Sequence, residues 1–88
     1  MNYGELRKKI LDSISIVLVD ELEHLKELEE KGEISLEQYE DASLERKFEY
    51  QEWKDDLLLT EDSKLLEHFR YILERAEKIT VPPTNCLA

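Results

Sequence analysis

Glu21 and His24 are the residues of this chain whose types and spacing come nearest to a metal site. They form a Glu-x-x-His pair, the spacing by which helical di-iron proteins place two ligands on one helix face. Such a site needs a second pair and two further inward glutamates. The only other histidine, His68, has Leu65 rather than a glutamate three positions before it. We therefore expect no metal site and no cofactor, and interpret both histidines as residues at the edge of a core.

Nucleophilic catalysis has no better support in the sequence. There is no Gly-x-Ser-x-Gly motif and no glycine-rich phosphate loop, which are the patterns that would indicate a serine nucleophile or a nucleotide site. The single cysteine, Cys86, cannot form an internal disulfide and fits a reducing compartment. We expect no catalytic residues and a protein that acts by binding.

The apolar residues repeat with the 3.6-residue period of a helix. The repeat predicts helices over residues 3–31, 36–59 and 61–80. The composition agrees, because 39% of the chain is charged and 41% is hydrophobic, with only two glycines and two prolines. We expect one all-α domain over residues 1–81, in which a long antiparallel helical hairpin and a third helix form a three-helix bundle. Residues 82–88 are expected to be a flexible C-terminal tail.

The helix ends and the apolar stripes follow from the same pattern. Thr60 is the expected N-cap of the third helix, with Glu61 and Asp62 in its first turn, where the helix dipole favours acids. Val81-Pro82-Pro83 ends that helix. The predicted core stripes include Ile10, Leu11, Ile14 and Val17 in the first helix, Leu36, Tyr39, Trp53 and Leu57 in the second, and Leu65, Leu66, Phe69, Ile72 and Ile79 in the third.

A tight turn is predicted between the first two helices. Gly32 offers the left-handed conformation that commonly ends a helix, and Ser35-x-x-Gln38 is a capping box that begins the next one. The stretch from Leu25 to Tyr39, with its leucine-rich helix end and its Lys31-Gly32-Glu33-Ile34-Ser35 turn, resembles the turn of short bacterial helical-hairpin domains of the SHOCT type. The resemblance covers about fifteen residues and implies the hairpin turn, without any function.

Glu21 and Arg46 interrupt the apolar stripes of the first two helices. Because both helices rise about 1.5 Å per residue, residues that face each other across the hairpin have numbers that add up to a nearly constant value. Glu21 and Arg46 give the same total as Ile14 and Trp53. An unpaired charge in an apolar seam costs several kcal/mol, so we predict a partly buried ion pair that fixes the register. The alternatives are a coincidence of two separate charges, or Glu21 as a catalytic acid or metal ligand.

The second predicted helix carries most of the net charge of −10. Residues 32–59 hold nine acidic and three basic residues, and many of the acids stand three or four positions apart, where each like-charge pair costs about 0.2–0.5 kcal/mol. Folding alone does not favour this arrangement. The candidate partner-binding residues, which we name the acidic face, are Asp41, Leu44, Glu45, Phe48, Glu49, Glu52 and Asp56.

Leu44 and Phe48 have two interpretations. An exposed aromatic residue among carboxylates is typical of an interaction patch, in which the ring provides buried area and the charges attract a basic partner. Alternatively, the third helix or a second subunit covers both side chains, and the acids are only a solvated face. Ile16 and Val19 raise the same question, because they point away from the main stripe of the first helix.

The negative charge limits the partners that the chain can bind. It repels nucleic-acid phosphates and anionic lipids, so we expect no direct binding to nucleic acid or to a membrane. The longest apolar run, residues 16–19, is too short to span a bilayer, and the N-terminus lacks the layout of a signal peptide. These features favour a cytoplasmic protein.

We expect a small regulator or inhibitor that uses the acidic face against a basic site on a partner protein. A narrower version is a nucleic-acid mimic, whose carboxylates imitate successive phosphates. The alternative is a structural module that homo-oligomerises as a helical bundle, with a homodimer as its simplest form. A carboxylate-metal enzyme is a third class, with weaker support.

Overall fold

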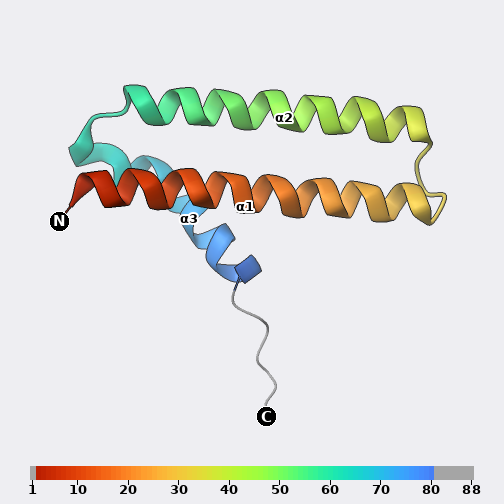
Figure 1. Cartoon of the computed structure of the whole chain (residues 1–88), viewed down its shortest axis with the longest axis horizontal. Helices are drawn as coiled ribbons and strands as arrows, with labels where there is room; N and C mark the ends of the chain where they lie inside the picture. The colour runs from red at the N-terminus through yellow and green to blue at the C-terminus, as the bar shows by residue number, and fades with distance from the viewer. Residues whose placement is uncertain (1, 81–88) are drawn as a thin grey trace, which may run out of the picture.

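The chain folds into helices, without any strand, over residues 2–80, which are the residues that the computed structural model describes (Figure 1). α1 (Tyr3–Glu30) and α2 (Leu36–Leu59) run antiparallel, and a short 3₁₀ helix, η1 (Asp62–Lys64), leads into α3 (Leu65–Thr80). The predicted all-α fold, a long hairpin with a third helix packed against it, is confirmed. The predicted tail, with Cys86, lies outside the described residues.

The turn between α1 and α2 forms as its residues predict. Gly32 has a φ of 78°, and the amides of Gly32 and Glu33 donate to the carbonyls of Glu29 and Leu28 at 3.0 and 2.9 Å. These are the two hydrogen bonds of a Schellman motif, which ends a helix with a left-handed residue. The Ser35 and Gln38 side chains and amides bond reciprocally at 3.0 and 2.8 Å, and this capping box starts α2. The reversal of the chain is therefore fixed by local contacts.

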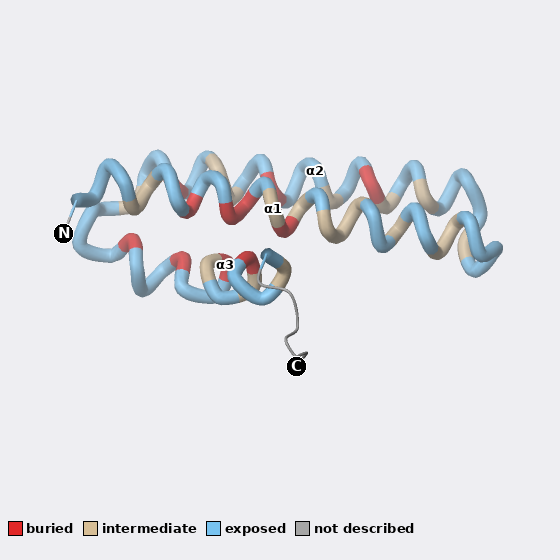
Figure 2. Tube along the Cα trace, turned by 60° about the horizontal axis from the view of Figure 1, so that its bottom comes forward, coloured by how far each residue is buried: buried red, intermediate tan, exposed pale blue. Residues whose placement is uncertain are grey.

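The apolar core lies where α3 crosses the hairpin. α3 packs mainly against α1, near the end of the hairpin where α1 begins and α2 ends (Figure 1). Figure 2 shows that most of the buried residues lie in this half of the molecule. The buried apolar residues are Ile10, Ile14 and Val17 of α1, Tyr50 and Leu57 of α2, and Leu65, Phe69, Ile72 and Ala76 of α3.

The other half of the hairpin, toward the turn, is two helices thick and buries much less. Its apolar seam residues, including Leu22, Leu25 and Tyr39, are only partly buried, because α3 does not reach them. Ser43 is the buried residue of this half, and its hydroxyl has no hydrogen-bond partner among residues 2–80. The ammonium group of Lys26 lies over the Tyr39 ring, 5.4 Å from its centre, in a cation–π contact between α1 and α2.

The start of the third helix differs from the prediction. Thr60 is the C-cap of α2 rather than the N-cap of the next helix, and its hydroxyl donates to the carbonyl of Asp56 at 2.7 Å. The chain then passes through η1, and α3 begins at Leu65. Threonine serves at either end of a helix, because its hydroxyl can bond to a carbonyl four residues back as well as to an amide ahead. The sequence pattern did not separate these two roles.

Some residues of the predicted apolar stripes do not enter the core. Leu11, Leu36 and Leu66 are exposed, and so is Tyr3, which lies on the same predicted stripe as Leu11. Leu36 lies in the thin half of the hairpin, and Leu11 and Leu66 lie on flanks that no helix within residues 2–80 covers. No helix in this described part of the chain is apolar over a stretch long enough to cross a membrane.

Arg7 holds the corner between α2 and α3. Its guanidinium group donates to the carbonyls of Leu57 and Thr60, and it lies 2.6 Å from the carboxylate of Asp62. The last carbonyls of a helix have no partner within the helix and carry its negative dipole end, so a cation there is favoured. One side chain of α1 therefore joins the end of α2 to the start of η1.

We expect Arg7→Ala to lower the free energy of unfolding by about 1–2 kcal/mol, because it removes three charge-assisted hydrogen bonds at a partly exposed site. Urea denaturation followed by circular dichroism measures this change. Lys8→Ala removes an exposed cation from the neighbouring position and should change stability by less than about 0.5 kcal/mol. Equal effects of the two variants would contradict the role of Arg7.

Candidate functional site

Glu21 binds side chains from both of the other helices. Its Oε2 accepts a hydrogen bond of 2.7 Å from the Tyr50 hydroxyl and lies 3.6 Å from Nε of Arg46, both on α2. Its Oε1 lies 3.2 Å from Nη2 of Arg75 on α3. The side chain of Glu21 is 19% exposed, so the carboxylate is largely withdrawn from water. We name these four residues the Glu21 cluster.

The Glu21 cluster is larger than the ion pair that the sequence predicts. Arg46 does lie at ion-pair distance from Glu21, but it also lies 3.3 Å from Glu49, and it is more exposed than Glu21. Tyr50 and Arg75 were missed. Tyr50 resembles any aromatic residue of an apolar stripe, and the position of Arg75 depends on how α3 crosses the hairpin. The one sign in the sequence that Arg75 faces a partner was its place as a basic residue between Ile72 and Ala76 of the apolar stripe.

The surroundings raise the pKa of two residues of the cluster, Tyr50 and Arg75. Burial raises the pKa of Tyr50 above its ordinary value of 10, and the hydrogen bond to Glu21 raises it further. The hydrogen bond with the Tyr71 hydroxyl raises the pKa of Arg75, and the charge of Glu21 adds to this effect. At neutral pH Tyr50 is a neutral donor and Arg75 is a cation. A carboxylate that faces two guanidinium groups suits a structural role better than metal binding.

We expect Glu21→Gln to lower the free energy of unfolding by about 1–2 kcal/mol, because the amide keeps an acceptor for Tyr50 but leaves Arg75 without its counter-charge and Arg46 with Glu49 alone. Glu23→Gln is the matched control, since Glu23 is exposed on the same helix. Urea denaturation of both variants measures the difference. A loss no larger than that of the control would show that the cluster does not hold the helices together.

Stability should also fall at alkaline pH through Tyr50. The folded state holds the phenol proton more tightly than the unfolded chain, so the contribution of Tyr50 is present below about pH 10 and is lost as the pH rises. We expect the wild-type protein to lose about 1 kcal/mol more than Tyr50→Phe between about pH 8 and pH 11. Tyr3→Phe removes an exposed hydroxyl and should follow the wild type. Parallel curves for Tyr50→Phe and the wild type would contradict this linkage.

The seven residues of the acidic face are all exposed along α2. Leu44 is 56% exposed and Phe48 is 64% exposed, because α3 packs mainly against α1 and not against this side of α2. The third helix therefore does not cover Leu44 and Phe48 in the described chain, contrary to one of the two interpretations of these residues. Both side chains are therefore exposed to solvent in the described chain.

The charges of the acidic face are mostly uncompensated. Glu49 is turned toward Arg46, at 3.3 Å. Within residues 2–80, the other four carboxylates form no ion pair; they are those of Asp41, Glu45, Glu52 and Asp56. The face therefore combines an apolar pair with a local excess of negative charge.

Leu58 and Leu59 extend the exposed apolar surface at the end of α2. They are 79% and 84% exposed, and neither is among the residues predicted to bind a partner. The signal was present in the run Leu57-Leu58-Leu59, because consecutive helical residues point about 100° apart and three in a row cannot all enter one core. Leu57 is buried, and its two neighbours are left outside.

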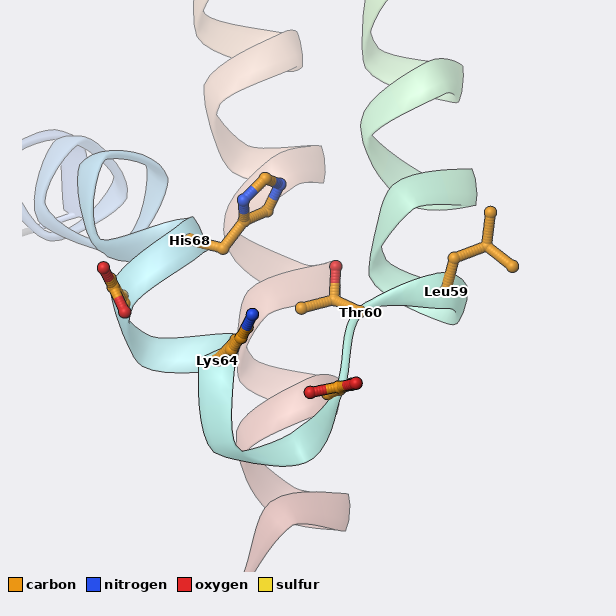
Figure 3. A pocket seen from close by; sticks show the side chains of 6 residues that line it. Leu59, Thr60, Lys64 and His68 are labelled. Carbon is orange, nitrogen blue, oxygen red and sulfur yellow. The ribbon is translucent and has the colours of Figure 1, made fainter.

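A hollow with a volume of about 640 Å³ lies at the corner between α2 and α3. Its lining residues are Leu59, Thr60, Glu61, Lys64, Glu67 and His68. Figure 3 shows Leu59 pointing away from His68, so these side chains do not converge on one point. In the part of the chain described by the structure, no three side chains of metal-binding type come together, and His24 and His68 are both exposed.

No family model, no curated protein and no solved structure matches this chain.

Proposed function

We propose that this chain is a regulator or inhibitor that acts by binding, without catalysis, and that it presents the acidic face to a basic site on a partner protein. The exposure of Leu44 and Phe48 on an uncovered side of α2 is the observation that carries the proposal. Apolar surface gains about 25 cal/mol for each Å² removed from water, and these two side chains can gain it only against a partner.

The charges support a basic partner. Residues 32–59 carry nine acids against three bases, and their mutual repulsion is relieved when positive charges approach. Complementary charge also raises the association rate, in a way that falls with ionic strength. A partner surface with basic residues around an apolar pocket for Phe48 would use both properties of the face.

Mimicry of a nucleic acid is a narrower form of this proposal. Asp41 and Glu45 lie one helical turn apart, as do Glu52 and Asp56, so each pair is spaced by about 6 Å along the helix axis. Two such pairs on one face could occupy a basic groove that otherwise holds phosphates. As part of the proposal, the protein works in the cytoplasm and does not itself bind nucleic acid or lipid.

A homo-oligomeric module is the second candidate function. Ile16 and Val19 of α1 line a shallow groove of about 320 Å³ with Ile79 of α3, and a second copy could cover it. The net charge of −10 opposes self-association. Sedimentation equilibrium distinguishes the two candidates, because a module of this kind forms a homodimer that Val19→Glu disrupts.

The primary test is affinity purification of the tagged chain from its native cells, followed by mass spectrometry. We expect one stoichiometric partner with a basic surface. Phe48→Ala should raise the dissociation constant at least about 30-fold, as expected for the central residue of an interface. The double variant Glu45→Lys/Glu52→Lys should abolish binding, because both carboxylates lack ion pairs in the described chain and their reversal leaves the Glu21 cluster intact.

The matched control is Glu23→Lys/Glu27→Lys, which makes the same charge change on exposed positions of α1. It should bind the partner with less than about a threefold loss. Circular dichroism checks that all variants keep their helix content. Equal binding by the α2 and α1 charge-reversal variants would remove the acidic face from the proposal.

A further inference from the structure

A second cavity lies between α2 and α3, apart from the exposed apolar pair of the acidic face. Its volume is about 250 Å³, which is smaller than the roughly 300–1,000 Å³ of pockets for whole small molecules. It is lined by Trp53 and Asp56 of α2 and by His68, Phe69, Tyr71 and Ile72 of α3. A cavity of this size suits one side chain better than a complete metabolite.

The walls of the cavity are mostly aromatic, and neighbouring contacts hold two of the rings in place. Trp53 packs against the buried Tyr50, with ring centres 5.0 Å apart and a tilt of 37°. Phe69 is buried and meets His68 edge to face at 4.8 Å. Tyr71 is largely exposed and forms the outer wall. Aromatic faces carry negative electrostatic potential, so a cavity between them favours a cation.

The charges around the cavity also favour a cation. The carboxylate of Asp56 is exposed and has no ion-pair partner among residues 2–80. A positive charge next to the wall belongs to Arg75, which does not line the cavity but donates to the Tyr71 hydroxyl at 3.3 Å. Glu21 lies 3.2 Å from that guanidinium and offsets its charge. Lys64 lines the neighbouring hollow with His68 rather than this cavity.

We infer that this cavity binds the guanidinium group of an arginine side chain, stacked on the aromatic wall and paired with Asp56. A guanidinium is planar, stacks on aromatic rings and is less strongly hydrated than an ammonium group, so it fits such a slot better than lysine does. Asp56 belongs both to the cavity and to the acidic face, so an arginine beside the main contact of a docked protein can reach it. The inference rests on the proposed function for the source of the arginine.

The test uses Trp53, which is the only tryptophan of the chain, so its fluorescence reports on this cavity. Titration of the wild-type protein with N-acetyl-arginine amide, the form of an arginine within a protein, should change the emission saturably at millimolar concentrations. N-acetyl-norleucine amide, which has no charge, should leave it unchanged. Asp56→Asn and Tyr71→Leu should each weaken the binding at least about threefold, and both change exposed side chains outside the core.

Phe48→Ala is the control that separates this cavity from the proposed function. It should weaken partner binding at least about 30-fold and leave the titration unchanged. N-acetyl-arginine, whose amine is blocked and whose carboxylate is free, should bind more weakly than the amide, because Asp56 repels that carboxylate. The inference is overturned if the amide gives no saturable change, if norleucine amide acts equally well, if neither cavity variant weakens the binding, or if N-acetyl-arginine binds as tightly as the amide. A negative titration with intact partner binding would leave the proposed function standing.

Discussion

The carboxylate of Glu21 joins the three helices at the point where the apolar core ends. A largely buried carboxylate must be compensated, and here its partners come from α2 and α3 together: Tyr50 donates a hydrogen bond, and Arg46 and Arg75 form ion pairs. An ion pair of this kind adds little net stability compared with apolar packing, but leaving it half-satisfied is costly. A shift of α3 by one turn would separate Arg75 from Glu21. The cluster therefore selects one docking position of α3 from several that apolar packing alone would allow.

That docking position determines which surfaces stay open. Because α3 crosses beneath the start of α1, the exposed side of α2 keeps Leu44 and Phe48 in water, and a cavity with aromatic walls opens beside Trp53. The same arrangement leaves Leu58 and Leu59 exposed at the corner that Arg7 holds. The proposed binding surface and the inferred arginine site thus follow from one choice of helix packing.

Local signals were enough to predict the hairpin, and they were not enough to predict how the third helix docks. Gly32, Ser35 and Gln38 act within a few residues of one another, so their pattern alone indicates a Schellman motif and a capping box. The facing positions of Glu21 and Arg46 followed from the rise of two antiparallel helices. Arg7 and Arg75 bind groups about fifty residues away in the chain, and no periodicity marks such contacts. Thr60 was assigned to the wrong helix end because its chemistry serves both.

The uneven thickness of the hairpin has a consequence for its motions. The half toward the turn buries few apolar groups and contains Ser43, whose hidden hydroxyl lacks a partner in the described chain. Segments with so little buried surface open by local unfolding at a lower free energy than the whole domain, and their amide hydrogens exchange faster. Leu44 lies on this half and Phe48 lies at its border, so a partner would bind where the described hairpin begins to lose buried surface. Binding there would reduce local unfolding, and the entropy lost in ordering the hairpin tip would offset some of the contact energy.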